Sequence, residues 1–148
     1  NEAQWQVASD AMANLDGVVP YSVLPGNHDI GVDGDARDRE SELDAWFPPS
    51  RFGPALVSTF PEGSMANSFH RVTTSVGADV CILALEFAPR QQTVDWADSM
   101  LAAAGDCETL MTTHAYLHDD GERYQVGRGQ DRAAETGSCA SSRFPRMA

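Results

Sequence analysis

Apolar positions near the start of the chain follow two spacings, and each spacing predicts one type of secondary structure. In the first segment, apolar residues recur every three or four positions, which predicts an amphipathic helix that ends near Asp16-Gly17. Its apolar stripe consists of Trp5, Ala8, Met12 and Leu15. A mostly apolar run over residues 18–24, with Pro20 near its start, then predicts the first strand, and the breaker pair Pro25-Gly26 ends it.

The middle of the chain predicts a short helix followed by three strands. The helix has an apolar stripe of Leu43, Trp46 and Phe47, with Asp35 or Asp38 as a candidate cap, and Pro48-Pro49 stops it. Residues 55–60 and 68–75 predict two strands that pair in antiparallel fashion across a Pro-Glu-Gly-Ser turn. Residues 80–85 are all apolar, which is typical of a central strand covered on both faces.

The later part of the chain predicts one more helix and one more strand. The helix runs over residues 90–104 and ends at Gly105, and its inner stripe consists of Val94, Ala97, Leu101 and Ala104. Residues 109–113 predict the last strand. Residues 120–148 carry little periodicity, so we expect an irregular or disordered tail after a domain that spans residues 1–119. The alternation of helices and strands predicts the α/β class.

Composition narrows the class of protein. The chain has 148 residues, of which 42% are hydrophobic, and this is enough to build the core of one domain. Its formal charge of -12, with ten basic residues, argues against a nucleic-acid backbone as partner. No apolar stretch is long enough to predict a membrane span. Among the three cysteines, Cys81 is expected to be a small buried apolar residue, whereas Cys107 and Cys139 are candidates for a disulfide if the protein is exported.

Residues 23–29 present polar side chains directly after an apolar run. Asn27, His28 and Asp29 follow Gly26, whose lack of a side chain permits a sharp turn and a close approach to an ion or a phosphate. In open α/β sheets, ligands bind at the carboxyl ends of the strands, so the position favours a binding site. A polar turn, with Asn and Asp serving local turn chemistry, is the alternative.

The run Gly26-Asn27-His28-Asp29 resembles the GNHD/E signature of the calcineurin-like metallophosphoesterases, which include the purple acid phosphatases. Residues 91–96 resemble the Gln-x-x-x-Trp helix of that family, and residues 110–114 resemble a strand that ends in a metal-binding His. The resemblance covers roughly residues 1–120. It implies part of a metallophosphoesterase core, with mixed β-sheets arranged as a β-sandwich and flanked by helices.

The resemblance also assigns roles to individual residues. Asn27 and His114 are expected to bind metal, His28 to protonate the leaving group, and Asp29 to orient His28. The implied cofactors are divalent ions such as Mn, Fe or Zn, and the implied substrate is a phosphomonoester or phosphodiester. The alternatives are a structural His at a strand end for His114 and an exposed loop His for His28.

Other candidates compete with this interpretation. A loop over residues 29–40 approximates a calcium-binding loop, and a non-catalytic acidic module that binds Ca²⁺ there is the second hypothesis. His118 follows His114 by four residues, a spacing that joins two ligands on a helix but not on a strand. His70 is expected to be structural, Tyr116 to line a pocket or pack, and Glu86 to form an ion pair with Arg90 at a helix start.

Several motifs of the family are missing from the sequence. Members carry Asp-x-His and Gly-Asp-x-x-Asp before the GNHD turn and Gly-His-x-His near the end. Here about twenty-five residues precede Gly26, and Gly34-Asp35-Ala36-Arg37-Asp38 comes on the wrong side of the turn. We therefore expect an internal fragment of a longer protein, which by itself binds metal weakly and hydrolyses little.

Overall fold

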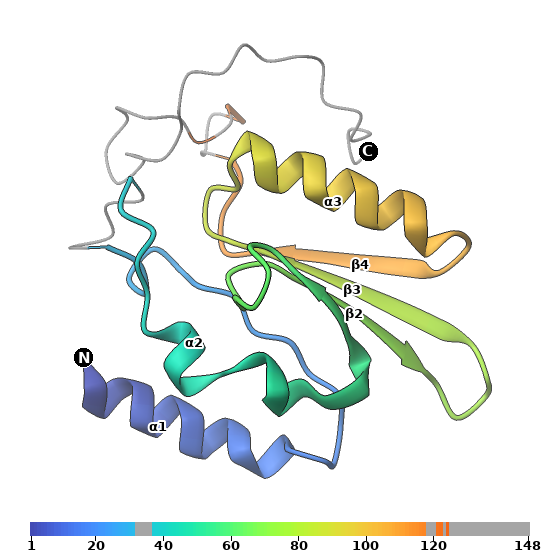
Figure 1. The fold of residues 1–148 in the computed structure, drawn as a ribbon, viewed down its shortest axis with the longest axis horizontal. Coiled ribbons are helices and arrows are strands. Elements are labelled where there is room, and N and C mark those ends of the chain that lie inside the picture. Colours follow the sequence, from blue (N-terminus) through green and yellow to red (C-terminus); the bar gives the residue numbers. More distant parts are fainter. Residues whose placement is uncertain (32–36, 118–120, 123, 125–148) are drawn as a thin grey trace.

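A computed structural model describes residues 1–31, 37–117, 121–122 and 124. The first part contains α1 (Glu2–Met12), the 3-10 helix η1 (Ala13–Leu15), α2 (Leu43–Trp46) and the 3-10 helix η2 (Pro49–Ala55). The second part contains four strands and one helix, namely β1 (Leu56–Thr59), β2 (Ser68–Thr73), β3 (Asp79–Leu85), α3 (Gln91–Ala104) and β4 (Glu108–Thr113). The helices flank a single sheet (Figure 1).

The four strands form one mixed sheet in the order β1-β2-β3-β4. The neighbours β1 and β2 are antiparallel, as are β2 and β3, whereas β3 and β4 are parallel and α3 connects them. The predicted α/β class, the antiparallel pair and the central apolar strand are thus confirmed. A second sheet, which a β-sandwich requires, is not among the described residues, so the metallophosphoesterase core stays a prediction.

The apolar side of α3 packs on the sheet and forms one core with it. Val94, Ala97 and Ala104 are buried on α3, as its stripe predicts, and the cluster includes Phe69, Cys81, Leu83 and Leu85 from the strands. Gly105 ends the helix with a φ of 64°, a left-handed conformation that favours glycine. Figure 1 shows α3 along one side of the sheet and α1 and α2 on the other side of the molecule.

A disulfide joins Cys81 in β3 to Cys107 at the start of β4. The candidate pairing of Cys107 with Cys139, which the sequence left open, is therefore excluded. Sequence spacing could not show which cysteine Cys107 would meet, because the parallel crossover through α3 brings the beginnings of β3 and β4 together. Cys81 is buried as expected, with 0% exposure, but as a bonded residue rather than a free thiol.

The segment predicted as the first strand joins no sheet in the described structure, and it begins in a turn, where the N–H groups of Val18 and Val19 donate to the carbonyl of Leu15. Residues 18–25 have no strand partner in the described structure, and Val18 and Val19 are exposed at 73% and 49%. Its apolar residues Tyr21 and Val23 instead pack against the cluster around Leu43, Phe47 and Phe52. An apolar run alone cannot separate a strand from an extended segment that lies on a core, because ladder hydrogen bonds depend on the neighbouring chain.

The helices of the first part also differ in detail from the prediction. Asn1 caps α1 by accepting a hydrogen bond from the backbone N–H of Gln4 at 3.2 Å. The helix α2 is a single turn; Asp38 bonds the N–H of Glu40 rather than capping it, and Asp35 lies outside the described residues. None of the helices in the described ranges has the length and apolar character needed to cross a membrane.

Candidate functional site

The turn after Pro25 is closed by its own polar groups. The N–H of Asp29 donates to the carbonyl of Gly26 at 3.1 Å, and Asp29 Oδ2 accepts a hydrogen bond from the N–H of Gly26 at 2.8 Å. Asp29 therefore has a local role in shaping the turn, which is the chemistry of the polar-turn alternative. The same bonds fix the backbone that carries Asn27 and His28 between them.

The end of β4 brings His114 to this turn. His114 Nε2 lies 3.0 Å from Asn27 Oδ1, across a sequence separation of 87 residues. Because the amide oxygen only accepts, the ring nitrogen is the donor in this hydrogen bond. The structure thus brings together the two residues predicted as metal ligands, and it does so between two different parts of the fold.

Gly26 makes this close approach possible. A Cβ added at Gly26 would lie 3.3 Å from His114 Nδ1 and 3.3 Å from Asp29 Oδ2, tighter than most carbon contacts allow. The imidazole therefore packs directly against the backbone of the turn, on one side of the glycine, and the ring of Phe87 supports it with a centroid distance of 5.8 Å. Glycine at residue 26 therefore lets the imidazole lie at this distance without a shift of His114 or Asp29.

His28 and Asp29 line an open hollow of about 840 Å³. Both residues are exposed, and the other walls come from α1 and from residues 38–46. Five carboxylates contribute to this lining, those of Glu2, Asp29, Asp38, Glu40 and Glu42. The predicted roles of His28 as proton donor and of Asp29 as its orienting partner stay predictions.

A buried acid network lies beside the site, and sequence reasoning found only part of it. Glu86, with 2% side-chain exposure, receives two hydrogen bonds from the Arg90 guanidinium at 3.0 and 3.1 Å, so the predicted ion pair at the helix start is confirmed. Thr93 Oγ1 also donates to Glu86 Oε1 at 2.7 Å, and Arg39 NH1 lies 3.6 Å from Glu86 Oε2. The sequence does carry a signal for this network, because Glu86 is an acidic residue that directly follows the apolar residues 80–85.

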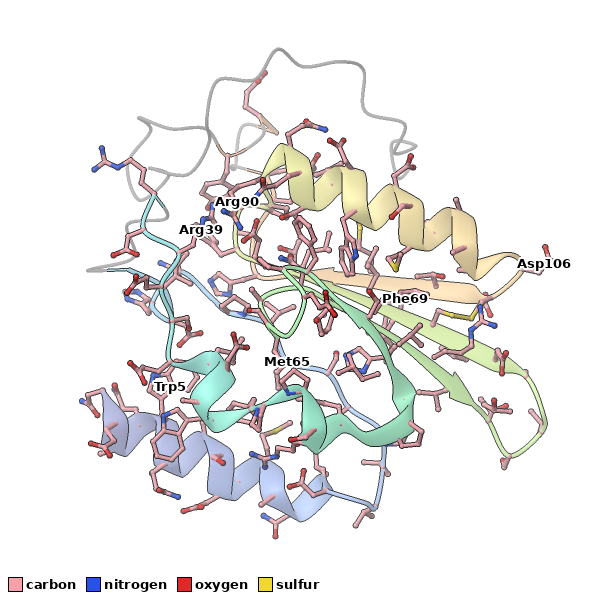
Figure 2. All side chains as sticks on the ribbon, in the orientation of Figure 1. Trp5, Arg39, Met65, Phe69, Arg90 and Asp106 are labelled. Carbon is pink, nitrogen blue, oxygen red and sulfur yellow. A yellow bond between two sulfur atoms is a disulfide. The ribbon has the colours of Figure 1, made fainter. Side chains whose placement is uncertain are left out.

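Arg39 was not predicted as part of the site. It comes from the loop before α2 and lies near Arg90 at the end of the sheet (Figure 2). Burial lowers the pKa of Arg39, while the Glu86 carboxylate acts in the opposite direction. These residues border a second cavity of about 420 Å³, whose walls also include Pro25 and Ile30 on either side of the GNHD turn.

His70 is structural, as expected. Its side chain is 1% exposed, its Nε2 bonds Ser68 Oγ at 2.9 Å, and its ring packs edge-on against Phe52. Burial lowers the pKa of His70 to about 4, because the charged imidazolium would lose its hydration. His70 is therefore neutral at physiological pH.

Of the remaining candidates, some lie outside the described residues and others lie within them. His118 lies outside the described residues, as do Asp33 and Gly34 of the calcium-like loop. Two described residues of that loop are bonded to each other, since the N–H of Gly31 donates to the carbonyl of Glu40 at 3.0 Å. Tyr116 takes part in backbone pairing with Tyr124. Within the described ranges, no group of three or more His, Cys, Asp or Glu side chains is arranged to hold a metal ion.

The chain is similar to a curated protein of unknown role, but it matches no protein-family model. The chain is 29% identical over 128 residues to the uncharacterized protein YvnB of Bacillus subtilis (strain 168), a match that covers 84% of this chain. It spans only 9% of the length of that curated relative. No protein-family model matches the chain, and no solved structure matches it.

Proposed function

We propose that this chain contributes part of the site of a metal-dependent phosphoesterase that resembles the calcineurin-like family. In this proposal Asn27 and His114 are ligands of one divalent cation, and His28 is the proton donor to the leaving group. The observation that carries the proposal is the 3.0 Å separation of Asn27 Oδ1 and His114 Nε2. Because the chain spans 9% of its curated relative, the remaining ligands are assigned to other parts of a longer protein.

The separation of the two atoms suits shared coordination. Two ligands that lie about 2.1 Å from one ion, at right angles to each other, are about 3.0 Å apart. An amide oxygen and an imidazole nitrogen form a mixed donor set that suits Mn, Fe or Zn better than Ca. The glycine supports the same assignment, since a side chain at residue 26 would require His114 or Asp29 to shift by a few tenths of an ångström.

Ligand binding through His114 Nε2 requires the tautomer with its proton on Nδ1, because Nε2 now donates to Asn27. When bound, divalent ions polarise the phosphoryl oxygen and supply hydroxide from water at neutral pH. The protein contributes the orientation of the turn, through the two hydrogen bonds between Gly26 and Asp29.

His28 is suited to proton transfer by its position. Its side chain is exposed, and it lines the hollow of about 840 Å³, whose lining includes neither Asn27 nor His114. The carboxylates of this hollow disfavour a free phosphate unless cations neutralise the site, so substrate binding is expected to depend on metal. A general acid at this position donates to the leaving alkoxide.

Calorimetric titration with Mn²⁺ or Zn²⁺ tests the proposal on the 148-residue chain. We expect weak binding by the wild type, and a loss of at least tenfold in affinity for both Asn27→Ala and His114→Ala. His28→Ala is the matched control, because it should keep metal binding and lower only the slow turnover of para-nitrophenyl phosphate. Metal binding that is indifferent to residues 27 and 114 would remove the basis of the proposal.

The calcium-binding module stays the second hypothesis and is tested in the same titration. The backbone bond from Gly31 to Glu40 closes the loop between them, which is the observation in its favour. Calcium-selective binding that disappears in Glu40→Ala, and persists in Asn27→Ala, would favour this module over the esterase.

A further inference from the structure

The residues on either side of His114 are held by the chain that follows β3. Thr113 Oγ1 donates a hydrogen bond to the carbonyl of Glu86 at 3.0 Å. The N–H of Ala88 donates to the carbonyl of Ala115, also at 3.0 Å. With the Phe87 ring packed against the imidazole, residues 86–88 contact His114 and both of its neighbours. The position of His114 therefore depends on the backbone of residues 86–88.

Arg39 fixes that backbone from the opposite side. Its NH1 donates to the carbonyl of Phe87 at 2.6 Å and its NH2 to the carbonyl of Ala88 at 3.2 Å. The guanidinium is 14% exposed and also lies 3.6 Å from the Glu86 carboxylate. Two donors in a planar fork hold two successive carbonyl groups, a geometry that the single ammonium of a lysine does not reproduce.

Arg39 is also connected to the GNHD turn. The carbonyl of the next residue, Glu40, accepts the N–H of Gly31 at 3.0 Å. Ile30 packs in one apolar cluster with Phe87 and Ala88. The contacts thus form a closed ring, which runs from Asn27 through Ile30, Arg39 and residues 86–88 to His114, and returns to Asn27.

Ala88 is the strained member of this ring. Its φ is 46°, and among the described residues other than glycine it alone has a positive φ. L-residues rarely adopt this conformation, and it persists where surrounding bonds over-determine it. Here both backbone groups of Ala88 are engaged, the N–H by Ala115 and the carbonyl by Arg39.

We propose that Arg39 is a positioning residue, which holds residues 86–88 in the conformation that keeps His114 against Asn27. Its significance for metal binding rests on the proposed function, whereas its effect on the contact between His114 and Asn27 does not. Arg39 acts through the carbonyl groups of Phe87 and Ala88.

NMR of the His114 imidazole tests the inference without any metal. We expect the ring nitrogen and proton shifts of His114 in Arg39→Ala to move from the wild-type values toward those of Asn27→Ala. Arg39→Lys should give a partial shift, since it keeps the charge and loses the fork, and it serves as the test if Arg39→Ala does not fold. Wild-type His114 shifts in a folded Arg39 variant would overturn the inference.

Arg51 offers a matched control for a general loss of stability. Like Arg39, it bonds two backbone carbonyl groups, that of Ser9 in α1 at 2.9 Å and that of Trp46, five residues away in α2, at 3.1 Å. These contacts tie α1 to α2, away from His114. Arg51→Ala should leave the His114 shifts unchanged, and an equal change in both arginine variants would show that Arg39 has no special effect on His114.

Ala88→Gly tests the route through the strained residue. Glycine adopts a positive φ without steric cost, so residues 86–88 should depend less on Arg39 in that background. We expect Arg39→Ala to change the His114 shifts less in the Ala88→Gly protein than in the wild type. An equal change in both backgrounds would contradict the proposed route.

A Mn²⁺ titration of the same variants separates this inference from the proposed function. We expect Arg39→Lys to weaken Mn²⁺ binding about tenfold, as supporting residues around metal ligands commonly do. If Arg39 variants alter the His114 shifts but the wild type binds no Mn²⁺, the positioning role is supported and the esterase is not. If the wild type binds Mn²⁺ through Asn27 and His114, and Arg39→Ala binds equally well, the positioning role is wrong.

Discussion

The sheet with α3 and the segment before the sheet are stabilised in different ways. In the sheet half, Cys81, Leu83 and Ala84 of β3 have 0% exposure, and the strands are joined by ladders and by a disulfide. In the first half, α1 has no buried residue, and Val7 is 69% exposed. The helix α1 contributes only partly buried residues, Trp5 and Met12, to the apolar cluster around Leu43, Phe47 and Phe52. Polar contacts of Arg51 with Ser9, Asp16 and Trp46 add to this packing in the first half.

The candidate site lies where these two halves meet. Asn27 comes from the irregular segment of the first half, and His114 comes from the end of β4 in the sheet half. The geometry of the pair therefore depends on hydrogen bonds between loops as much as on the apolar core. Burial decides whether the sheet forms, and polar contacts decide whether the two predicted ligands face each other.

The largest expected effect comes from the core of the sheet half. Leu83→Ala removes a side chain with 0% exposure that packs beneath α3, and we expect it to lower the free energy of unfolding by about 3 to 4 kcal/mol. Val7→Ala in α1 is the control, with an expected change of about 0.5 kcal/mol or less. Urea denaturation measures both. Equal effects would show that the two halves do not differ in packing.

The contact between the halves is expected to depend on pH through His70, which lies on β2 against Phe52 of η2. Its pKa of about 4 in the folded state is below the ordinary 6.5, so only the unfolded chain binds the proton between these values. The stability from neutral His70 is therefore fully present above pH 6.5 and is lost as the pH falls toward 4, by about 3 kcal/mol.

Urea unfolding at pH 7.5, 5.5 and 4.5 measures this dependence. Carboxylates also titrate in the acidic part of the range, so the wild type is compared with His70→Gln, which has no titrating ring. We expect the variant to lose less stability than the wild type as the pH falls. Parallel curves for the two proteins would contradict the assigned role of His70.

A smaller and more local effect is expected from Arg51. Arg51→Ala removes its hydrogen bonds to the carbonyl groups of Ser9 and Trp46 and its cation–π contact with Phe47, and should cost about 2 kcal/mol. Hydrogen exchange should show the loss mainly in α1, with protection kept in β2, β3 and β4. A uniform loss would mean that both halves unfold as one cooperative unit.

Much of the sheet half could be predicted from the sequence. The apolar run of β3, the stripe of α3 and the stop at Gly105 are local signals, and each matches the structure. The first half was predicted less well, because residues 18–24 carry an apolar pattern but gain no strand partner. The sequence also left the disulfide open, since pairing depends on the distance between Cα atoms, here 5.9 Å for Cys81 and Cys107.

Part of the candidate site could likewise be predicted from the sequence, and part could not. Asn27, His28 and His114 stand out in the sequence because polar residues follow apolar runs, and a resemblance suggested their roles. Arg39 carried no such signal, because an arginine in a polar loop is ordinary until two distant carbonyl groups are found beside it.

By itself, the sequence determined which segments are helical or extended, since periodicity and glycine act through local geometry. Only the tertiary structure decided which cysteines pair, whether residues 18–24 join the sheet, and that Asn27 and His114 lie 3.0 Å apart. Those outcomes depend on contacts between residues far apart in the chain, and they follow from how the elements pack rather than from any single stretch.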